Sequence, residues 1–180
     1  MPRVRLEPPE PADRREFLKL VEASYDLHRP WTYPPADAPS YRRLLERNRA
    51  DNFYALLLRR NEDDAIVGIF EFSEIVRGSF QNAYLGYWVG EPFAQRGYMR
   101  EGMQLALRFA FGELRLHRIE ANIQPTNRRS LALAEDAGFR REGFSPRYLK
   151  IGGRWRDHER WAILSDDARM GHKGGRLRRR

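Results

Sequence analysis

The stretch from Tyr84 to Phe111 contains the residue types that point most directly to chemistry. An apolar, aromatic run typical of a strand, Tyr84–Val89, leads through a short loop ending in Arg96 and Gly97 into an amphipathic helix. A glycine there lets the backbone approach a ligand closely, and the first turn of the helix presents unpaired N–H groups at the positive end of its dipole. The sequence therefore predicts a binding site for phosphate oxygens.

A second segment, Asn127 to Phe139, supplies polar groups that could reach the same ligand. Asn127 stands where it can cap a helix, and Ser130 follows about one turn later on a neighbouring face. Each feature alone is common, since many glycines only permit a turn and many asparagines only cap. The complete dinucleotide fingerprint of glycines and the Gly-Lys-Ser/Thr of a P-loop are both missing from the sequence, which removes the two commonest competing motifs.

Together the two segments resemble the GNAT superfamily of acetyl-CoA-dependent N-acetyltransferases. The resemblance covers most of the chain, from about Phe17 to Leu164, and extends to the bacterial ribosomal-protein alanine N-acetyltransferase branch. It implies an α/β fold of the acyl-CoA N-acyltransferase type, with a mostly antiparallel mixed sheet of six to seven strands flanked by helices. The residues that carry the branch resemblance are Leu116–Asn122, Pro125, Asn127, Ala137–Phe139, Glu142-Gly143, Tyr148-Leu149 and Gly153–His158.

The resemblance also implies a site for acetyl-CoA. In this family the strand before the loop separates from its neighbour and pairs with pantetheine, and backbone N–H groups of the loop bind the pyrophosphate. The loop pattern Q/R-x-x-G-x-G/A falls on residues 94–99, where Gly97 matches but Ala94 and Met99 depart from the first and last positions. The implied cofactor-binding residues are Trp88, Val89, Gln95, Arg96, Gly97, Tyr98, Met99 and Asn127.

Acetyl transfer to an amine needs a base for the amine, stabilisation of an oxyanion and a proton for the departing thiolate. The chain has no cysteine, so a Cys-acyl intermediate is impossible and direct attack in a ternary complex is expected. The usual glutamate base of the family aligns with Asn122 and its usual tyrosine acid with Ala134, which leaves Ser130 as the candidate proton donor. The candidate bases are Glu71, Glu120, His117 and a water chain held by Asn122.

The acceptor site is expected between an aromatic loop, Pro30–Pro39, and a hairpin, Tyr148–Trp161. Glu71 or Glu74 could attract an ammonium group there, although core packing would equally account for the aromatic side chains. No metal is expected, because neighbouring residues on a strand point to opposite faces and the pair Asp157-His158 cannot converge on one ion. The expected substrate-binding residues are Trp31, Tyr33 and Trp155.

Hydrophobic spacing indicates the elements that position these residues. A helix capped by Asp13 and a second helix capped by Ser40 precede the strands, and strands then alternate with helices while hairpins bracket them. This order predicts a mixed α/β sheet rather than a purely parallel one. The expected strands are Arg3–Leu6, Phe53–Arg59, Ile66–Ile75, Tyr84–Val89, Arg118–Ile123, Arg147–Ile151 and Trp155–Leu164. The later helices are Met99–Glu113 and Asn127–Ala137.

Length and charge indicate one domain with a basic end. We expect a single domain over residues 1–168 of the 180, and a disordered tail over 169–180 that holds six basic residues and no acid. The tail is either a solvated end or a weak contact to RNA or the ribosome. No membrane span or signal peptide is expected, and the protein is expected in the cytoplasm as a monomer or dimer.

Three functions stay open from the sequence. The first is acetyl transfer to the N-terminal α-amino group of a protein, Ala- or Ser-initiated and ribosomal. The second is acetylation of a small amine such as an amino acid, polyamine or antibiotic. The third is a CoA-binding or RNA-associated protein without catalysis, which the absence of the family's glutamate and tyrosine keeps open.

Overall fold

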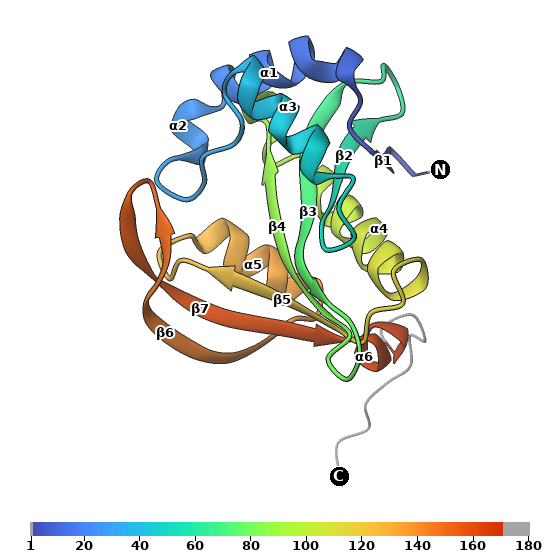
Figure 1. Cartoon of the computed structure of the whole chain (residues 1–180), viewed down its shortest axis with the longest axis vertical. Helices are drawn as coiled ribbons and strands as arrows, with labels where there is room; N and C mark the ends of the chain where they lie inside the picture. Colours follow the sequence, from blue (N-terminus) through green and yellow to red (C-terminus); the bar gives the residue numbers. More distant parts are fainter. Residues whose placement is uncertain (1, 171–180) are drawn as a thin grey trace.

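The computed structural model describes residues 2–170, and its strands form one seven-stranded sheet in the order β1-β2-β3-β4-β5-β7-β6 (Figure 1). Among the described strands, β4 and β5 are parallel and every other neighbouring pair is antiparallel. The predicted mixed, mostly antiparallel sheet is confirmed. The strands are β1 (Val4–Glu7), β2 (Tyr54–Arg60), β3 (Ile66–Val76), β4 (Asn82–Val89), β5 (Arg118–Ile123), β6 (Arg140–Ile151) and β7 (Arg154–Leu164).

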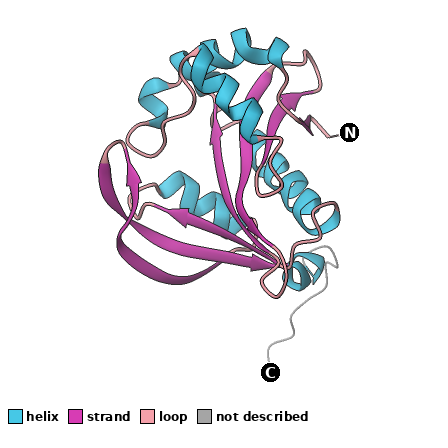
Figure 2. Ribbon diagram, viewed as in Figure 1, coloured by secondary structure: helices cyan, strands magenta, loops and turns pink. Residues whose placement is uncertain are grey.

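Helices cover both faces of this sheet (Figure 2). One core joins α1 and α3 to alternate strand residues such as Leu57 and Ile69, and the other joins α4 and α5 to the intervening residues such as Leu58 and Phe70. This alternation is the period of two that places successive side chains on opposite faces. The helices are α1 (Arg14–Ala23), α2 (Tyr25–His28), α3 (Ala38–Arg47), α4 (Tyr98–Gly112), α5 (Arg128–Asp136) and α6 (Ser165–Met170), with 3-10 turns η1 (Pro11–Asp13) and η2 (Glu91–Phe93).

The parallel strands β4 and β5 separate after a short paired stretch. Their register ends at the pair Tyr84 and Glu120, so the second half of β4 has no strand beside it on that edge. The Gly90 N–H donates to the Val67 carbonyl, so the backbone groups of Gly90 point toward β3. Backbone N–H and C=O groups alternate in direction from one residue of a strand to the next. The backbone groups of Tyr87 and Val89 therefore point the other way, into the gap between β4 and β5. The separation that the resemblance implied is present.

Several predicted boundaries need correction. Ser40 does not cap α3: Asp37 is the cap and accepts from the Ser40 N–H at 2.7 Å, while the Ser40 hydroxyl accepts from the Asp37 N–H at 3.1 Å. Strand β6 begins at Arg140 rather than Arg147, because register shifts along its pairing with β7 interrupt the simple alternation that marks a strand in sequence.

At the carboxyl end, α6 runs from Ser165 to Met170, and the boundary of the domain at residue 168 stays a prediction. The rest of the predicted basic tail, residues 171–180, lies outside the described residues. Within residues 2–170, no helix has the length and apolar character needed to cross a membrane.

Candidate active site

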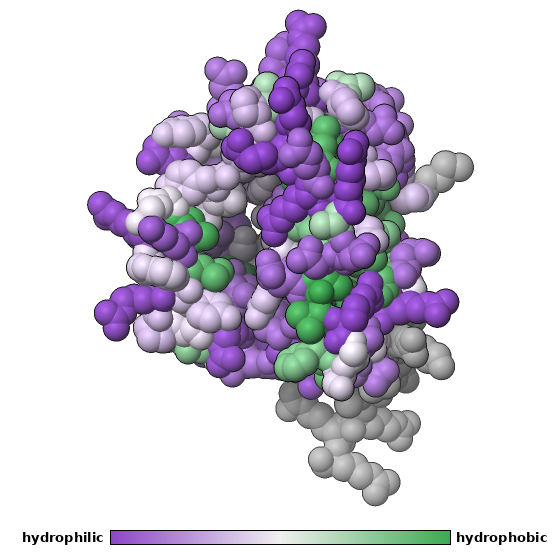
Figure 3. Space-filling view, viewed as in Figure 1, coloured by the Kyte–Doolittle hydropathy of each residue, from purple (hydrophilic) through white to green (hydrophobic). Residues whose placement is uncertain are grey.

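A cavity of about 920 Å³ crosses the sheet where β4 and β5 separate. Met99 and Ser130 line it on the side of α4 and α5, and Trp31 and His158 line it on the opposite side. Figure 3 shows the face nearest the viewer hollowed at this position. A molecule bound in the gap would therefore reach both faces of the sheet.

The amino end of α4 opens into this cavity. Gly97 precedes the helix with a φ of +82°, and Gln95 also has a positive φ, of +60°. The N–H groups in the first turn of a helix have no partner within the helix, and no side chain caps this one. Gln95, Gly97, Tyr98 and Met99 all line the cavity. The loop therefore presents backbone donors to an anion, as its sequence predicts.

Arg96 is placed differently from its neighbours in the loop. It is absent from the residues that line the cavity, and its carbonyl accepts a hydrogen bond from the Arg3 guanidinium at 3.2 Å. The Arg3 guanidinium also lies over the Tyr98 ring, 4.8 Å from its centroid, and forms an ion pair with Glu101. Arg96 thus helps to hold the loop against the amino-terminal segment.

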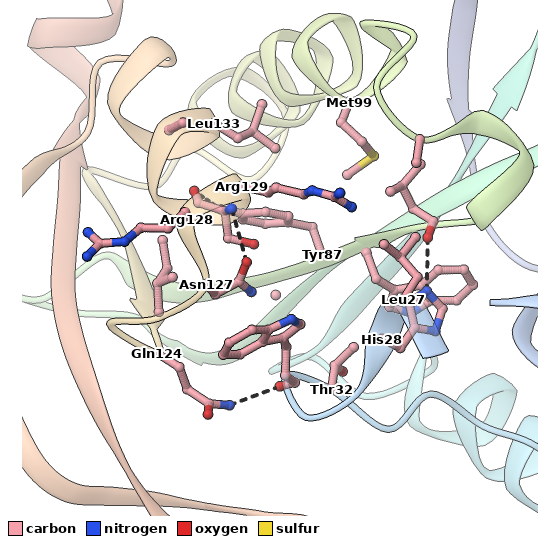
Figure 4. Close-up of a pocket in the computed structure, with 18 of the residues that line it drawn as sticks. Leu27, His28, Thr32, Tyr87, Met99, Gln124, Asn127, Arg128, Arg129 and Leu133 are labelled. Atoms are coloured by element: carbon pink, nitrogen blue, oxygen red, sulfur yellow. Dashed lines mark hydrogen bonds between the residues drawn. The ribbon is translucent and has the colours of Figure 1, made fainter. Parts of the chain in front are cut away.

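The amino end of α5 forms the second wall. Asn127 caps the helix by accepting from the Ser130 N–H at 3.2 Å, and the Tyr87 hydroxyl donates to the Ser130 carbonyl at 3.1 Å. Arg128 and Arg129 also line the cavity. In Figure 4, the Arg129 side chain extends over the cavity toward Met99, while Arg128 extends away. Sequence reasoning did not single out Arg129, although its place in the first turn of a helix at an anion site is a usable signal.

His28, on α2, is a cavity residue that the sequence did not reveal. Its Nε2 forms a hydrogen bond of 2.9 Å with the Val89 carbonyl, and its ring centroid lies 4.8 Å from that of Trp88. Burial lowers the pKa of His28, so the ring is neutral at neutral pH. The Trp88 indole itself packs in the core beside Phe17, so Trp88 can offer little side-chain surface to a ligand.

Glu71 does not line the cavity itself but lies next to it, on the face opposite α4. A Cβ atom built on Gly86, which lines the cavity, would lie 3.9 Å from the Glu71 Oε2. Burial raises the pKa of Glu71, and the positive charge of Arg47 partly offsets this effect. Asn122 lines the cavity beside β4, and its buried Oδ1 has no hydrogen-bond partner within residues 2–170.

The other two candidate bases lie elsewhere. The Glu120 carboxylate accepts from the Arg118 Nε at 2.8 Å and from the Asn82 amide at 3.3 Å, so it is already engaged. His117 lies at the far end of the sheet, where its N–H donates to the Gln81 carbonyl at 2.7 Å. Neither residue lines the cavity.

Of the three predicted acceptor-binding aromatics, only Trp31 lines the cavity. Gln124 holds the Trp31 loop in place by donating to the Trp31 carbonyl at 3.3 Å (Figure 4). Tyr33 instead packs on the turn between β6 and β7, where a Cβ on Gly152 would meet its hydroxyl at 2.5 Å. Trp155 is 62% exposed and lies outside the cavity lining.

Within residues 2–170, no three His, Asp or Glu side chains gather as a metal site would require. Asp157 and His158 separate as the strand geometry predicts. The Asp157 carboxylate accepts from the Arg147 N–H at 2.7 Å, whereas His158 lines the cavity.

The chain is similar to known acetyltransferases over most of its length. A model of the acetyltransferase (GNAT) domain matches residues 3–140. The ribosomal protein uS5-alanine N-acetyltransferase of Escherichia coli (strain K12) is 35% identical over 156 residues, which cover 87% of this chain and 79% of that protein.

Two solved structures share the fold. The structure of Mycobacterium smegmatis RimJ in complex with CoA-disulfide superposes with a TM-score of 0.83 at 27% identity, over 91% of this chain and 82% of that chain. The spermidine N-acetyltransferase of Vibrio cholerae, in complex with CoA and spermine, gives 0.79 at 21% identity over 92% of this chain and 98% of that chain. At that identity the second match supports the fold alone.

These matches agree with the geometry of the cavity. The positive-φ glycine, the unpaired N–H groups of α4 and the open edge of β4 together fit the phosphates and the amide-bearing arm of acetyl-CoA. The hypothesis of a protein without catalysis has no support, since the matched relatives are N-acetyltransferases. The chain belongs to the GNAT family and is an acetyl-CoA-dependent N-acetyltransferase.

Proposed function

We propose that the enzyme acetylates the N-terminal α-amino group of a protein, with a ribosomal protein as the leading candidate. The observation that carries the proposal is a cavity that crosses the sheet and is lined by Gly86, with the half-buried carboxylate Glu71 directly beside this glycine on the acceptor side. The 35% identity to an enzyme whose name specifies a ribosomal-protein alanine supports this choice of acceptor. A cytoplasmic location remains a prediction from the sequence.

On the cofactor side, backbone groups position the reacting thioester. Acetyl-CoA supplies an acetyl group on a thioester, the acyl donor for an amine. The N–H groups at the start of α4 bind phosphate oxygens, while Asn127 fixes the first turn of α5. The Val89 N–H points into the gap, where it polarises the acetyl carbonyl. The hydrogen bond between His28 Nε2 and the Val89 carbonyl keeps Val89 in this position.

On the acceptor side, Glu71 removes the proton from the incoming ammonium group. Asn122 occupies the position of the family's usual base, but an amide cannot take up a proton at neutral pH, so it can only accept a hydrogen bond through its unpaired Oδ1. A carboxylate whose pKa is raised by burial is better matched to this task, because a higher pKa makes it a stronger base. Ser130, directly or through water, returns a proton to the departing thiolate.

A small amine is the second candidate acceptor. The same fold occurs in a spermidine N-acetyltransferase, so the fold is compatible with a small amine. A polyamine carries several positive charges, so it would need carboxylates along the acceptor side. The neighbouring carboxylates Glu120 and Glu142 are both paired with Arg118, which argues against this acceptor.

A substrate panel tests the proposal. Purified enzyme and acetyl-CoA would be offered peptides that begin with Ala, Ser or Met, the same peptides with blocked N-termini, and spermidine. We expect CoA release with Ala- and Ser-initiated peptides, and mass spectrometry should place the acetyl group on the α-amino nitrogen. Turnover of spermidine, with no peptide acetylated, would replace the proposal with the second candidate.

A further inference from the structure

We propose that the acceptor site contains a cationic subsite, Arg156 and Arg160 of β7, that binds an acidic side chain at the fourth or fifth residue of the acceptor peptide. The inference rests on the proposed function, because it specifies which protein N-termini the enzyme prefers. The two arginines lie on either side of His158 in the sequence, and all three residues face the same side of β7.

The position of His158 places the pair beside the cavity, although neither arginine is among its lining residues. His158 lines the cavity and is only 3% exposed. Alternate residues of a strand lie roughly 6.5 Å apart on one face, so Arg156 and Arg160 flank the point where the cavity meets β7. Burial lowers the pKa of His158, so the arginines supply the positive charge in this row.

Each of the two arginines has a buried N–H donor that lacks a hydrogen-bond partner in the described part of the chain. The Nε atoms of Arg156 and Arg160 are buried and have no hydrogen-bond partner among the residues described. Buried guanidinium N–H groups are normally paired, and a carboxylate is the acceptor that matches their planar geometry. An acidic side chain of the acceptor would supply that partner.

Two carboxylates on the strands beside β7 are engaged elsewhere. Glu120 and Glu142 both pair with Arg118. Arg118 lowers the pKa of Glu142 most, and Arg160 adds a smaller contribution without forming an ion pair with it. Within residues 2–170, neither Arg156 nor Arg160 forms an ion pair with a carboxylate. The positive charge of the row is therefore available to a ligand.

Arg160 is also held in place rather than free in solvent. It stands opposite Gly143 on β6, and a Cβ built on this glycine would lie 2.4 Å from the Arg160 Nη2. The side chain therefore lies flat across the backbone of Gly143. A guanidinium held in this way loses less conformational entropy when it binds a carboxylate.

The register of the sheet gives the distance to the reacting amine. Gly86 lies beside Glu71 and, two residues past the last pair of β4 and β5, is level with Asn122, which pairs with Arg160 on β7. From Glu71 on β3 to Arg160 on β7 there are three strand spacings, which are roughly 14 Å and which an extended peptide covers in about four residues. With its amine at Glu71, a peptide would place its fourth or fifth side chain near Arg160.

The test compares three matched peptides that begin with Ala and carry Glu, Gln or Lys at positions 4 and 5. The kcat/KM of each would be measured for the wild type, Arg156→Glu, Arg160→Glu and the control Arg108→Glu. Arg108 is exposed on α4, across the sheet from the acceptor, so the control changes the net charge equally. Acetyl-CoA binding by calorimetry would verify that each variant is folded, and Arg→Gln variants would replace any that is not.

We expect the wild type to prefer Glu over Lys peptides by roughly tenfold or more, mainly through KM. Arg156→Glu and Arg160→Glu should reverse this preference, and Arg108→Glu should keep it. A wild-type ratio near one, or a preference unchanged in both variants, would overturn the subsite while peptide acetylation stands. Turnover of spermidine or free glutamate, with no peptide acetylated, would contradict the proposed function and the subsite with it.

Discussion

The two faces of the sheet contribute to the active site through different kinds of groups. On the α4 and α5 face, the cavity wall presents backbone N–H groups, set by the positive φ of Gly97 and by the open edge of β4. On the opposite face, charged side chains from separate strands lie beside the cavity, with Glu71 on β3 and Arg160 on β7. A backbone site tolerates many sequences and binds one invariant ligand, whereas the side chains decide which acceptor is used.

The largest effect should come from the backbone site. Gly97→Tyr should abolish acetyl-CoA binding, because the positive φ strains any other residue and a Cβ there would already lie 3.1 Å from the Arg3 Nη2. Calorimetry would measure the loss, and Gly112→Tyr is the matched control, since a Cβ on Gly112 meets nothing within 4 Å. Normal binding by the Gly97 variant would mean that the phosphate site has been misplaced.

Glu71→Gln tests the acceptor face alone. Loss of a general base reduces turnover by about 100-fold or more, and we expect a fall of that size in kcat with peptide substrates. Glu74→Gln is the control, because Glu74 is exposed on the same strand. If the Glu71 variant retained full turnover, another group, such as a water held by Asn122, would have to remove the proton from the amine.

Ser130→Ala should have a smaller effect, since the departing thiolate can also take a proton from water. We expect kcat to fall roughly tenfold with little change in the Kd of acetyl-CoA. The Asn127 cap uses the Ser130 N–H, which the substitution retains, so the helix should remain intact. If only the affinity changed, Ser130 would be a binding residue rather than a proton donor.

The smallest effect is a shift in the pH profile. Burial raises the pKa of Glu71 above its ordinary value of 4.5, and Arg47 opposes that rise. Because the base acts only when deprotonated, activity should fall as the pH drops through the pKa of Glu71. Arg47→Met removes the charge that lowers the pKa of Glu71, so this loss of activity at low pH, the acid limb of the profile, should move to higher pH. Arg43→Met, at an exposed position of the same helix, should leave the acid limb in place. An unmoved limb in the Arg47 variant would contradict the assignment of the base.

The difference between the faces also explains what the sequence could predict. The glycine loop, the start of α4 and the Asn127 cap are local patterns, and the structure places them where the sequence indicates. The choice among Glu71, Glu120 and His117 depended on which strands neighbour each other and which partners engage each side chain, and no local pattern contains that information.

His28 and the loop aromatics illustrate the same limit. The four-residue helix α2 is too short for periodicity to reveal, so the contact between His28 and Val89 appears only in the folded chain. Tyr33 and Trp155 belong to segments that do border the acceptor side, yet Tyr33 packs on Gly152 and Trp155 faces solvent. Their segments could be placed from sequence, but the direction of each side chain could not.

The most direct test of the separation between the two faces is the Kd of acetyl-CoA for Glu71→Gln, measured by calorimetry beside the wild type. If backbone groups on one face hold the cofactor and side chains on the other act on the acceptor, the two Kd values should agree within about twofold. A Kd raised tenfold or more in the variant would contradict the account, because Glu71 would then take part in holding acetyl-CoA.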